Sequence, residues 1–236
     1  AQVNSTSDRA LRSIGGGRVQ TKSTHVSGPS SEVWGFSPHP NFGAPAIADP
    51  YAGLEWPALP STCTSAPISL RREARTLAPG THCGGLILNT GSEVTLEPGL
   101  HVVVGDLTVT SGSRLVGEGV TLIVLGPTST VRFQAGAEVV LKAQRSGPYA
   151  GLALAVAPQA VELTSEMLGG PDFELEGALY MPTQRLFITG GGRLAQPTSL
   201  QRMIVVNRLE TRGNGAIYLS GRDSLATTMG GAWLVN

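Results

Sequence analysis

Charged residues, cysteine and long apolar runs are all scarce in this chain of 236 residues. Only 14% of the residues are charged, against about 25% in ordinary globular domains. The 17 basic and 17 acidic residues cancel, and no block of lysine and arginine marks a surface for nucleic acid or anionic lipid. We therefore expect no nucleic-acid partner.

The longest apolar runs are too short for a membrane. None approaches the ~18 residues that a span needs, and the first residues lack the apolar core of a signal peptide. Membrane attachment would therefore require a segment outside this sequence. The length is sufficient for one sizeable core, in one elongated domain or in two compact ones.

The chain has two cysteines, Cys63 and Cys83, which lie twenty positions apart. Free thiols would suit a reducing cytosol, and a metal site would need more Cys or His nearby than His82 supplies. We favour a disulfide, which would suit an export compartment. Closing a loop of about twenty residues would contribute ~3 kcal/mol in the chain-entropy model.

Glycine, by contrast, is abundant and argues against helices. The 31 glycines are about 13% of the chain, against a usual ~7%. Few stretches long enough for a helix avoid glycine and proline, and the apolar spacing typical of helices is absent. The composition therefore predicts an all-β fold.

Apolar residues recur in pairs at i and i+2, with turn sequences such as Asn-Thr-Gly and Glu-Pro-Gly between the pairs. These pairs include Leu86 and Leu88, Val94 and Leu96, Val102 and Val104, Leu107 and Val109, Leu122 and Val124, and Leu152 and Leu154. Each pair offers one buried face of two residues, which is too small to fold alone. A sandwich of hairpins and a solenoid are the two all-β folds that would bury such faces.

The spacing of the pairs favours the solenoid, because the strand units fall into threes. Corresponding units start near Gly85, Asp106 and Thr130, about twenty to twenty-four residues apart, which is a period typical of solenoids. We predict a right-handed parallel β-helix with three short strands per coil.

This interpretation divides the chain into four parts. Residues 1–28 form an N-terminal coil, residues 63–221 form the main β-helix, and residues 222–236 form a C-terminal cap. Residues 29–62 are rich in proline, hold two tryptophans and show no alternation. We expect them to form a long excursion packed along the flank of the helix, with a disordered linker as the alternative.

The two ends of the predicted rod differ. The C-terminal cap contains Trp233 and Leu234, which we expect to fold across the open core as a plug. No comparable segment is present at the N-terminal end. We therefore expect that end to depend on another chain or on an upstream segment.

Several segments together suggest a family. They are "VNSTS", "ADPYAGL", "LAPGTHCGGLIL", "VTLEPGLHVV", "GVTLIVLG", "SGPYAGLAL" and "GALYMP". In this order they resemble the β-helical region of TadG-like pilus-assembly proteins of the tight-adherence (Flp) pilus system. The resemblance covers roughly residues 3 to 221, and "PGTHCGG" with an upstream Cys is its most specific piece. It implies an envelope protein whose N-terminal membrane segment is not part of this sequence.

This chain departs from the family pattern at its corners. The family usually has asparagine-rich "SGNA" corners, whereas this chain has "NTGSE", "TSGSR" and "QAGAE" at the equivalent places. We therefore expect no asparagine stack inside the corners.

Aromatic residues gather in the excursion. They are Trp34, Phe36, Phe42, Tyr51 and Trp56. Rings that face solvent would form a platform for a glycan, and rings that face the coil wall would anchor the excursion. We favour anchoring, and keep these five residues as candidates for surface binding.

An enzyme of this fold would need clustered acids. Hydrolysis takes two carboxylates about 5–9 Å apart, and elimination takes acidic calcium ligands beside a basic residue. The nearest candidates are Glu162, Glu166, Asp172, Glu174 and Glu176, which we interpret as solvated outer side chains. His82 and His101 would approach each other across a coil, where we favour packing over a metal bridge. We predict no catalytic residue, metal or cofactor.

The predicted function is that of a non-catalytic structural or assembly protein, in the periplasm or on the surface of a bacterium. Its partners would be proteins of the envelope or pilus. A surface adhesin or glycan-binding module is the alternative, and a carbohydrate-active lyase or hydrolase comes third. The fold alone does not decide among them.

Overall fold

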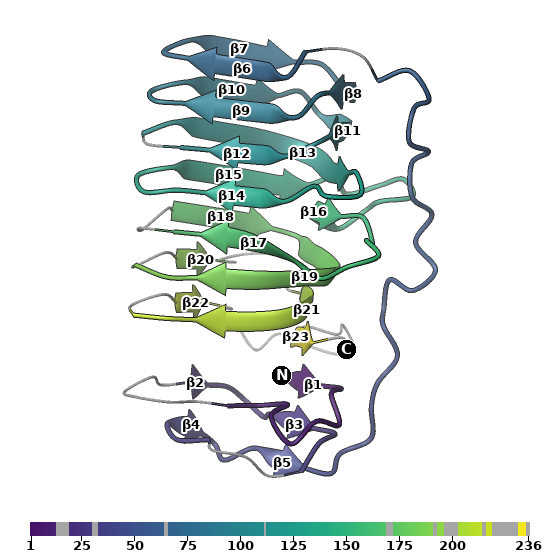
Figure 1. Ribbon diagram of the computed structural model, residues 1–236, viewed down its shortest axis with the longest axis vertical. Coiled ribbons are helices and arrows are strands. Elements are labelled where there is room, and N and C mark those ends of the chain that lie inside the picture. The colour runs from purple at the N-terminus through teal and green to yellow at the C-terminus, as the bar shows by residue number, and fades with distance from the viewer. Residues whose placement is uncertain are drawn as a thin grey trace.

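The computed structural model shows one elongated stack of strands (Figure 1). It describes residues 1–12, 19–29, 33–63, 66–110, 112–168, 172–190, 193–195, 203–213, 216–218 and 231–234. All regular elements in these ranges are β-strands, and they form a parallel β-solenoid of about nine turns. The chain follows a right-handed path in Figure 1, so the predicted fold class is confirmed.

The main coils follow one another in sequence, with three strands to each complete coil. The first, which we call the end coil, comprises β6 (Ile68–Arg71), β7 (Ala74–Leu77) and β8 (Gly80–Cys83). Next come β9 (Leu86–Asn89), β10 (Glu93–Leu96), β11 (Gly99–Val104), β12 (Leu107–Val109), β13 (Arg114–Leu125), β14 (Val131–Phe133), β15 (Glu138–Ala143) and β16 (Leu152–Val156). The series ends with β17 (Leu163–Met167), β18 (Asp172–Glu176), β19 (Ala178–Ile188), β20 (Arg193–Ala195), β21 (Met203–Thr211), β22 (Ala216–Tyr218) and β23 (Gly231–Leu234).

Side chains at equivalent positions of successive coils stack in columns inside the solenoid. Leu86, Leu107 and Val131 are in register across β9, β12 and β14. All three are almost fully buried, and they belong to one apolar core that includes residues from Leu70 to Val206. Each coil thus buries its small apolar face on the coils next to it, as the short i, i+2 pairs require.

Glycine turns the corner between the first and second strands of most coils. At these corners the backbone φ is positive, a conformation that glycine adopts without steric cost; they are Gly91 (72°), Gly112 (67°), Gly136 (71°), Gly190 (66°) and Gly213 (60°). Ser92 and Ser113 follow two of these glycines and are buried, so serine fills the inner side of these corners. The end coil turns the same corner with Arg72 at φ 53°. Arg72 is the only non-glycine residue in the described part of the chain that has a positive φ.

We expect Arg72→Gly to raise the free energy of unfolding by about 1 kcal/mol, because glycine removes the steric strain of an arginine at positive φ. Equilibrium denaturant titration would measure the change. Arg71→Gly is the matched control, since Arg71 lies in β6, where the extra backbone freedom of glycine should lower stability. A loss of stability in both variants would contradict the strain at Arg72.

One wall of the solenoid is buried on both faces. It is formed by β11, the second half of β13, β16, and the starts of β19 and β21. His101 on β11 is in register with the core residue Leu122, whereas Val102 and Val104 belong to a second apolar cluster with residues of the excursion. The predicted pair of Val102 and Val104 therefore faces the excursion and not the interior.

The first residues of the chain form the last coils of the solenoid. These coils contain β1 (Gln2–Val3), β2 (Val19–Gln20), β3 (His25–Val26), β4 (Phe36–Ser37) and β5 (Asn41–Phe42). Strand β1 pairs in parallel with β23 on one side and with β3 on the other. The described strands of residues 1–28, which are β1, β2 and β3, thus lie at the far end of the solenoid from the end coil (Figure 1).

The place of Trp233 and Leu234 corrects the predicted plug. Both residues lie in β23, whose backbone pairs with β21 and with β1. A strand with a partner on each side satisfies its backbone N–H and C=O groups, which a plug across the core would leave without partners. Residues 222–230 and 235–236 of the predicted cap lie outside the described part of the chain.

After β5 the chain runs along the flank of the solenoid from the N-terminal coils to the end coil (Figure 1). This excursion starts after Phe42, later than the predicted residue 29, because β4 and β5 already belong to a coil. Its residues Tyr51, Leu54 and Trp56 pack against the outer face of the wall that is buried on both sides.

Candidate functional site

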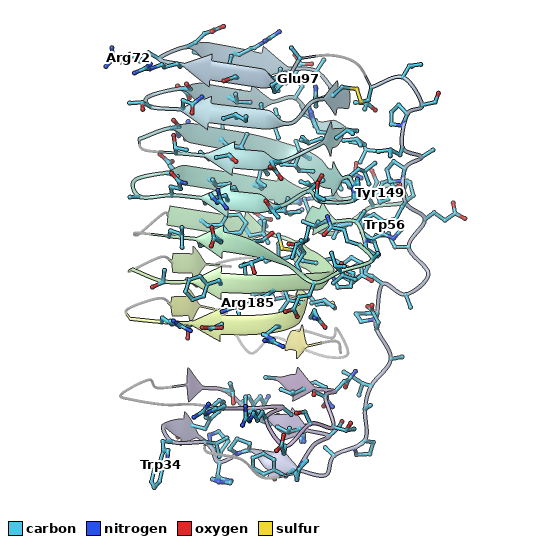
Figure 2. The ribbon with its side chains drawn as sticks, viewed as in Figure 1. Trp34, Trp56, Arg72, Glu97, Tyr149 and Arg185 are labelled. Carbon is cyan, nitrogen blue, oxygen red and sulfur yellow. A yellow bond between two sulfur atoms is a disulfide. The ribbon has the colours of Figure 1, made fainter. Side chains whose placement is uncertain are left out.

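Two aromatic residues of the excursion meet a tyrosine of the solenoid wall. The ring centroids of Tyr51 and Tyr180 are 5.0 Å apart, and Trp56 stacks on Tyr180 at 5.8 Å. The Tyr180 hydroxyl donates a hydrogen bond to Asp49 Oδ2 at 2.8 Å. We call Tyr51, Trp56 and Tyr180 the aromatic cluster; Figure 2 shows Trp56 beside Tyr149, whose hydroxyl donates to the Glu55 carbonyl at 2.8 Å.

The aromatic cluster anchors the excursion. Burial, followed by the hydrogen bond to Asp49, raises the pKa of Tyr180, so this hydroxyl stays protonated as a donor. Sequence reasoning missed Asp49, Tyr149 and Tyr180. The signal that marks this wall is the unbroken apolar run of strands such as β16 (Leu152–Val156), which is typical of strands buried on both faces.

The other three aromatic candidates lie at the far end, in the N-terminal coils. Trp34 is 74% exposed and projects from this end of the molecule (Figure 2). Phe36 and Phe42 are half-buried, and the ring of His39 meets Phe42 edge-on at 5.9 Å. The structure therefore separates the five candidates into two half-buried anchors of the excursion, Tyr51 and Trp56, and three residues of the N-terminal coils.

Acidic side chains on the outer walls pair with basic side chains of neighbouring coils. Arg114 donates hydrogen bonds to Glu93 and to Glu138, which lie on either side of it, at 3.0 Å each. Arg132 donates to Glu166 on the next coil at 2.9 Å. Exposed ion pairs of this kind contribute about 0–1 kcal/mol each, and their main effect is to balance charge from one coil to the next.

Three of the five acid candidates are in such pairs. Besides Glu166, Glu162 lies 3.8 Å from Arg208, and Glu176 lies 3.8 Å from Arg145. Glu174 is exposed on β18, and the side chain of Asp172 lies outside the described residues. Within the described part of the chain, no group of three or more His, Cys, Asp or Glu side chains is placed to hold a metal ion.

Glu176 and Arg145 also border a shallow pocket at a corner of the solenoid. Glu118 and Lys142 line the same pocket and approach each other to 3.6 Å. Its four charged groups form two ion pairs, so it offers no unpaired carboxylate for acid or base catalysis.

His82 and His101 do meet across a coil. His101 is fully buried, and its Nε2–H donates to the Glu97 carbonyl at 2.7 Å. Since a carbonyl only accepts, the neutral His101 ring leaves Nδ1 unprotonated, and it accepts from His82 Nε2 at 3.2 Å. The two rings therefore form a hydrogen-bonded pair at the end of the interior, whereas His25 and His39 lie in the N-terminal coils.

Burial lowers the pKa of both histidines. For His82 the neighbouring His101 and the positive charge of Arg75 lower the pKa further. For His101 the hydrogen bond to Glu97 and the Glu97 charge oppose the effect of burial without reversing it. The hydrogen bond between the rings needs an unprotonated Nδ1 on His101, so protonation of His101 breaks it.

Acidification is therefore expected to weaken the fold. Below the ordinary histidine pKa of 6.5 the unfolded chain takes up protons that the folded pair resists, so stability falls as the pH drops from 6.5 through the lowered folded pKa. Denaturant titrations at a series of pH values would measure the slope. The double variant His82→Gln/His101→Gln should flatten it, and His25→Gln should not; an unchanged slope in the double variant would contradict the assignment.

Cys63 and Cys83 form a disulfide, with their Cα atoms 5.3 Å apart. It joins the last part of the excursion to β8 of the end coil, so the excursion is held by the aromatic cluster and by a covalent bond. No described cysteine is free. The disulfide indicates an oxidising, non-cytoplasmic environment.

None of the described residues belongs to a helix long and apolar enough to cross a membrane. No protein-family model, curated protein or solved structure matches the chain.

Proposed function

We propose that this chain is a non-catalytic structural or assembly protein of the bacterial cell envelope, in the periplasm or on the cell surface, and that it serves the biogenesis of a tight-adherence (Flp) pilus. The sequence resemblance to TadG-like proteins supplies the pilus system. The oxidising environment indicated by the disulfide agrees with an envelope location.

The observation that carries the proposal is the pairing of charge between coils. Arg114 bridges Glu93 and Glu138 across three successive coils, and Arg132 pairs with Glu166 on the next coil. A hydrolase of this fold would present two carboxylates free to act on a sugar, about 5–9 Å apart. Walls whose charges are engaged with one another, around a continuous apolar core, are better suited to a stiff spacer.

Two measurements test this function. The protein would be screened for turnover of acidic and neutral polysaccharides and for their binding by calorimetry. Turnover would select an enzyme, and binding without turnover would select an adhesin. Deletion of the gene in the source bacterium should reduce the number of surface pili seen by electron microscopy, and normal piliation in the deletion strain would contradict the pilus role.

A glycan-binding function is the second candidate, favoured by the 74% exposure of Trp34. An exposed indole offers an apolar face on which a sugar ring can stack, and Phe36 and Phe42 of the same coils are half-buried. If this candidate holds, oligosaccharides that bind in calorimetry should lose affinity with Trp34→Ala. Leu59→Ala is the control, because Leu59 is an exposed apolar residue of the excursion.

A further inference from the structure

In the described part of the chain, each of the three strands of the end coil has a neighbouring strand on one side only. Among the described residues β6 pairs only with β9, β7 only with β10 and β8 only with β11. In a parallel ladder alternate residues direct their N–H and C=O groups to opposite sides. Half of these backbone groups on the end coil therefore point away from the solenoid, where Figure 1 shows no further strand.

The same coil carries three arginines without ion pairs in the described part of the chain: Arg71, Arg72 and Arg75. All three are exposed, and Glu73 is the only acidic residue between them. Elsewhere on the walls several basic residues pair with an acid of a neighbouring coil, as Arg114, Arg132, Lys142, Arg145 and Arg185 do. The end coil thus presents three basic side chains that have no acidic partner on a neighbouring coil within the described part of the chain.

Arg75 has an unusual place for a charged residue. It is in register with Val94 on the next coil, and Val94 is in register with Leu115 one coil further. The side chains of Val94 and Leu115 are fully buried. Arg75 therefore continues an inner column at the point where the column ends, and its side chain is exposed there. Together with Arg71 and Arg72, it gives this end of the solenoid a net positive charge.

We propose that the end coil is a docking surface for an extended acidic segment of a partner protein, which adds to β6 and β7 as a further strand and places carboxylates opposite Arg71, Arg72 and Arg75. The segment would complete the backbone ladder and the charge pattern at once, which a polysaccharide without backbone N–H groups does not do. This inference rests on the proposed assembly function and names the surface that performs it.

A second copy of this chain fits the surface less well. The far end of the molecule has proline at positions 38 and 40, beside β4 and β5, and proline lacks the N–H that a ladder needs. Two end coils facing each other would bring the arginines of both copies together, and like charges at an interface cost affinity. The partner is therefore a different chain.

The test uses the intact protein and three synthetic peptides, followed by fluorescence anisotropy. The first peptide alternates threonine and glutamate, the second alternates threonine and lysine, and the third alternates proline and glutamate. The acidic threonine peptide should bind at least about tenfold more tightly than the lysine peptide. The proline peptide should bind weakly despite its equal charge, because it cannot add as a strand.

Two variants of equal charge change locate the site. Arg71→Glu/Arg72→Glu should weaken binding of the acidic threonine peptide at least about tenfold, and Arg9→Glu/Lys22→Glu, at exposed positions in the N-terminal coils, should leave it unchanged. Amide hydrogen exchange of residues 68–77 should slow when this peptide binds.

Equal binding of both acidic peptides would mean that the surface binds by charge alone and not by strand addition, and this would overturn the proposal. No binding at all would also overturn it. A dimer in sedimentation at micromolar concentration that the Arg71→Glu/Arg72→Glu variant abolishes would assign the surface to a second copy. These outcomes are separate from the polysaccharide screen and the pilus count, so a failed peptide assay and a failed assembly function are distinguishable.

Discussion

Leu122→Ala is expected to lower the free energy of unfolding by about 2–5 kcal/mol. Leu122 is fully buried, and it lies between His101 on one coil and Leu154 on the next in an inner column. Removing its side chain leaves a cavity whose walls are strands held on both sides by backbone ladders, so the cavity has little freedom to collapse. Denaturant titration followed by circular dichroism measures the loss.

Glu174→Ala is the matched control for this substitution. Glu174 lies on β18 between two buried residues, Phe173 and Leu175, but its own side chain is exposed. Its truncation should change stability by less than about 0.5 kcal/mol. Equal losses from Leu122→Ala and Glu174→Ala would mean that the inner and outer faces of the strands have been assigned wrongly.

The main coils could be predicted from sequence because their signal is local and repeated. The predicted coil starts at Asp106 and Thr130 directly precede Leu107 and Val131, which the structure places in register. Each strand of these coils shows its own pair of apolar residues, and turn residues separate one strand from the next. In a parallel stack each coil contacts only the coils next to it, so the local pattern of one coil, repeated along the sequence, is enough to predict the fold.

The N-terminal coils could not be placed by the same reasoning. Strands β1 and β3 have two residues each, which is too few for any alternation to be seen. Their position depends on the pairing of β1 with β23, which joins the two ends of the sequence. Chain order suggested that the first coil lies beside the coil that starts at residue 68, and nothing local opposed that order.

The aromatic residues show a different limit. Trp34 and Trp56 both lie in proline-rich sequence, yet one is 74% exposed and the other packs on Tyr180. Residue type does not separate these roles, because the same ring suits an anchor and a binding platform. The separation follows from the wall beneath Trp56, whose outer face is apolar, and from the absence of such a wall near Trp34 among the described residues.

Val26→Asp tests the place of the N-terminal coils, and we expect it to destabilise them by about 3–5 kcal/mol, the cost of an uncompensated buried charge. Val26 is fully buried in β3, with β1 on one side and β5 on the other. When these strands separate, β23 loses its partner β1. Amide hydrogen exchange should therefore accelerate in residues 231–234 and stay unchanged in residues 68–77.

The control for this variant is Asn41→Asp, which introduces the same carboxylate at an exposed position of β5. It adds one negative charge to the same coils without burying it, so exchange in residues 231–234 should not change. If the N-terminal coil lay beside the end coil, as chain order alone suggests, Val26→Asp would instead accelerate exchange in residues 68–77. The two arrangements thus give opposite results in one measurement, because a coil that unfolds exposes the edge of the strand on which it was stacked.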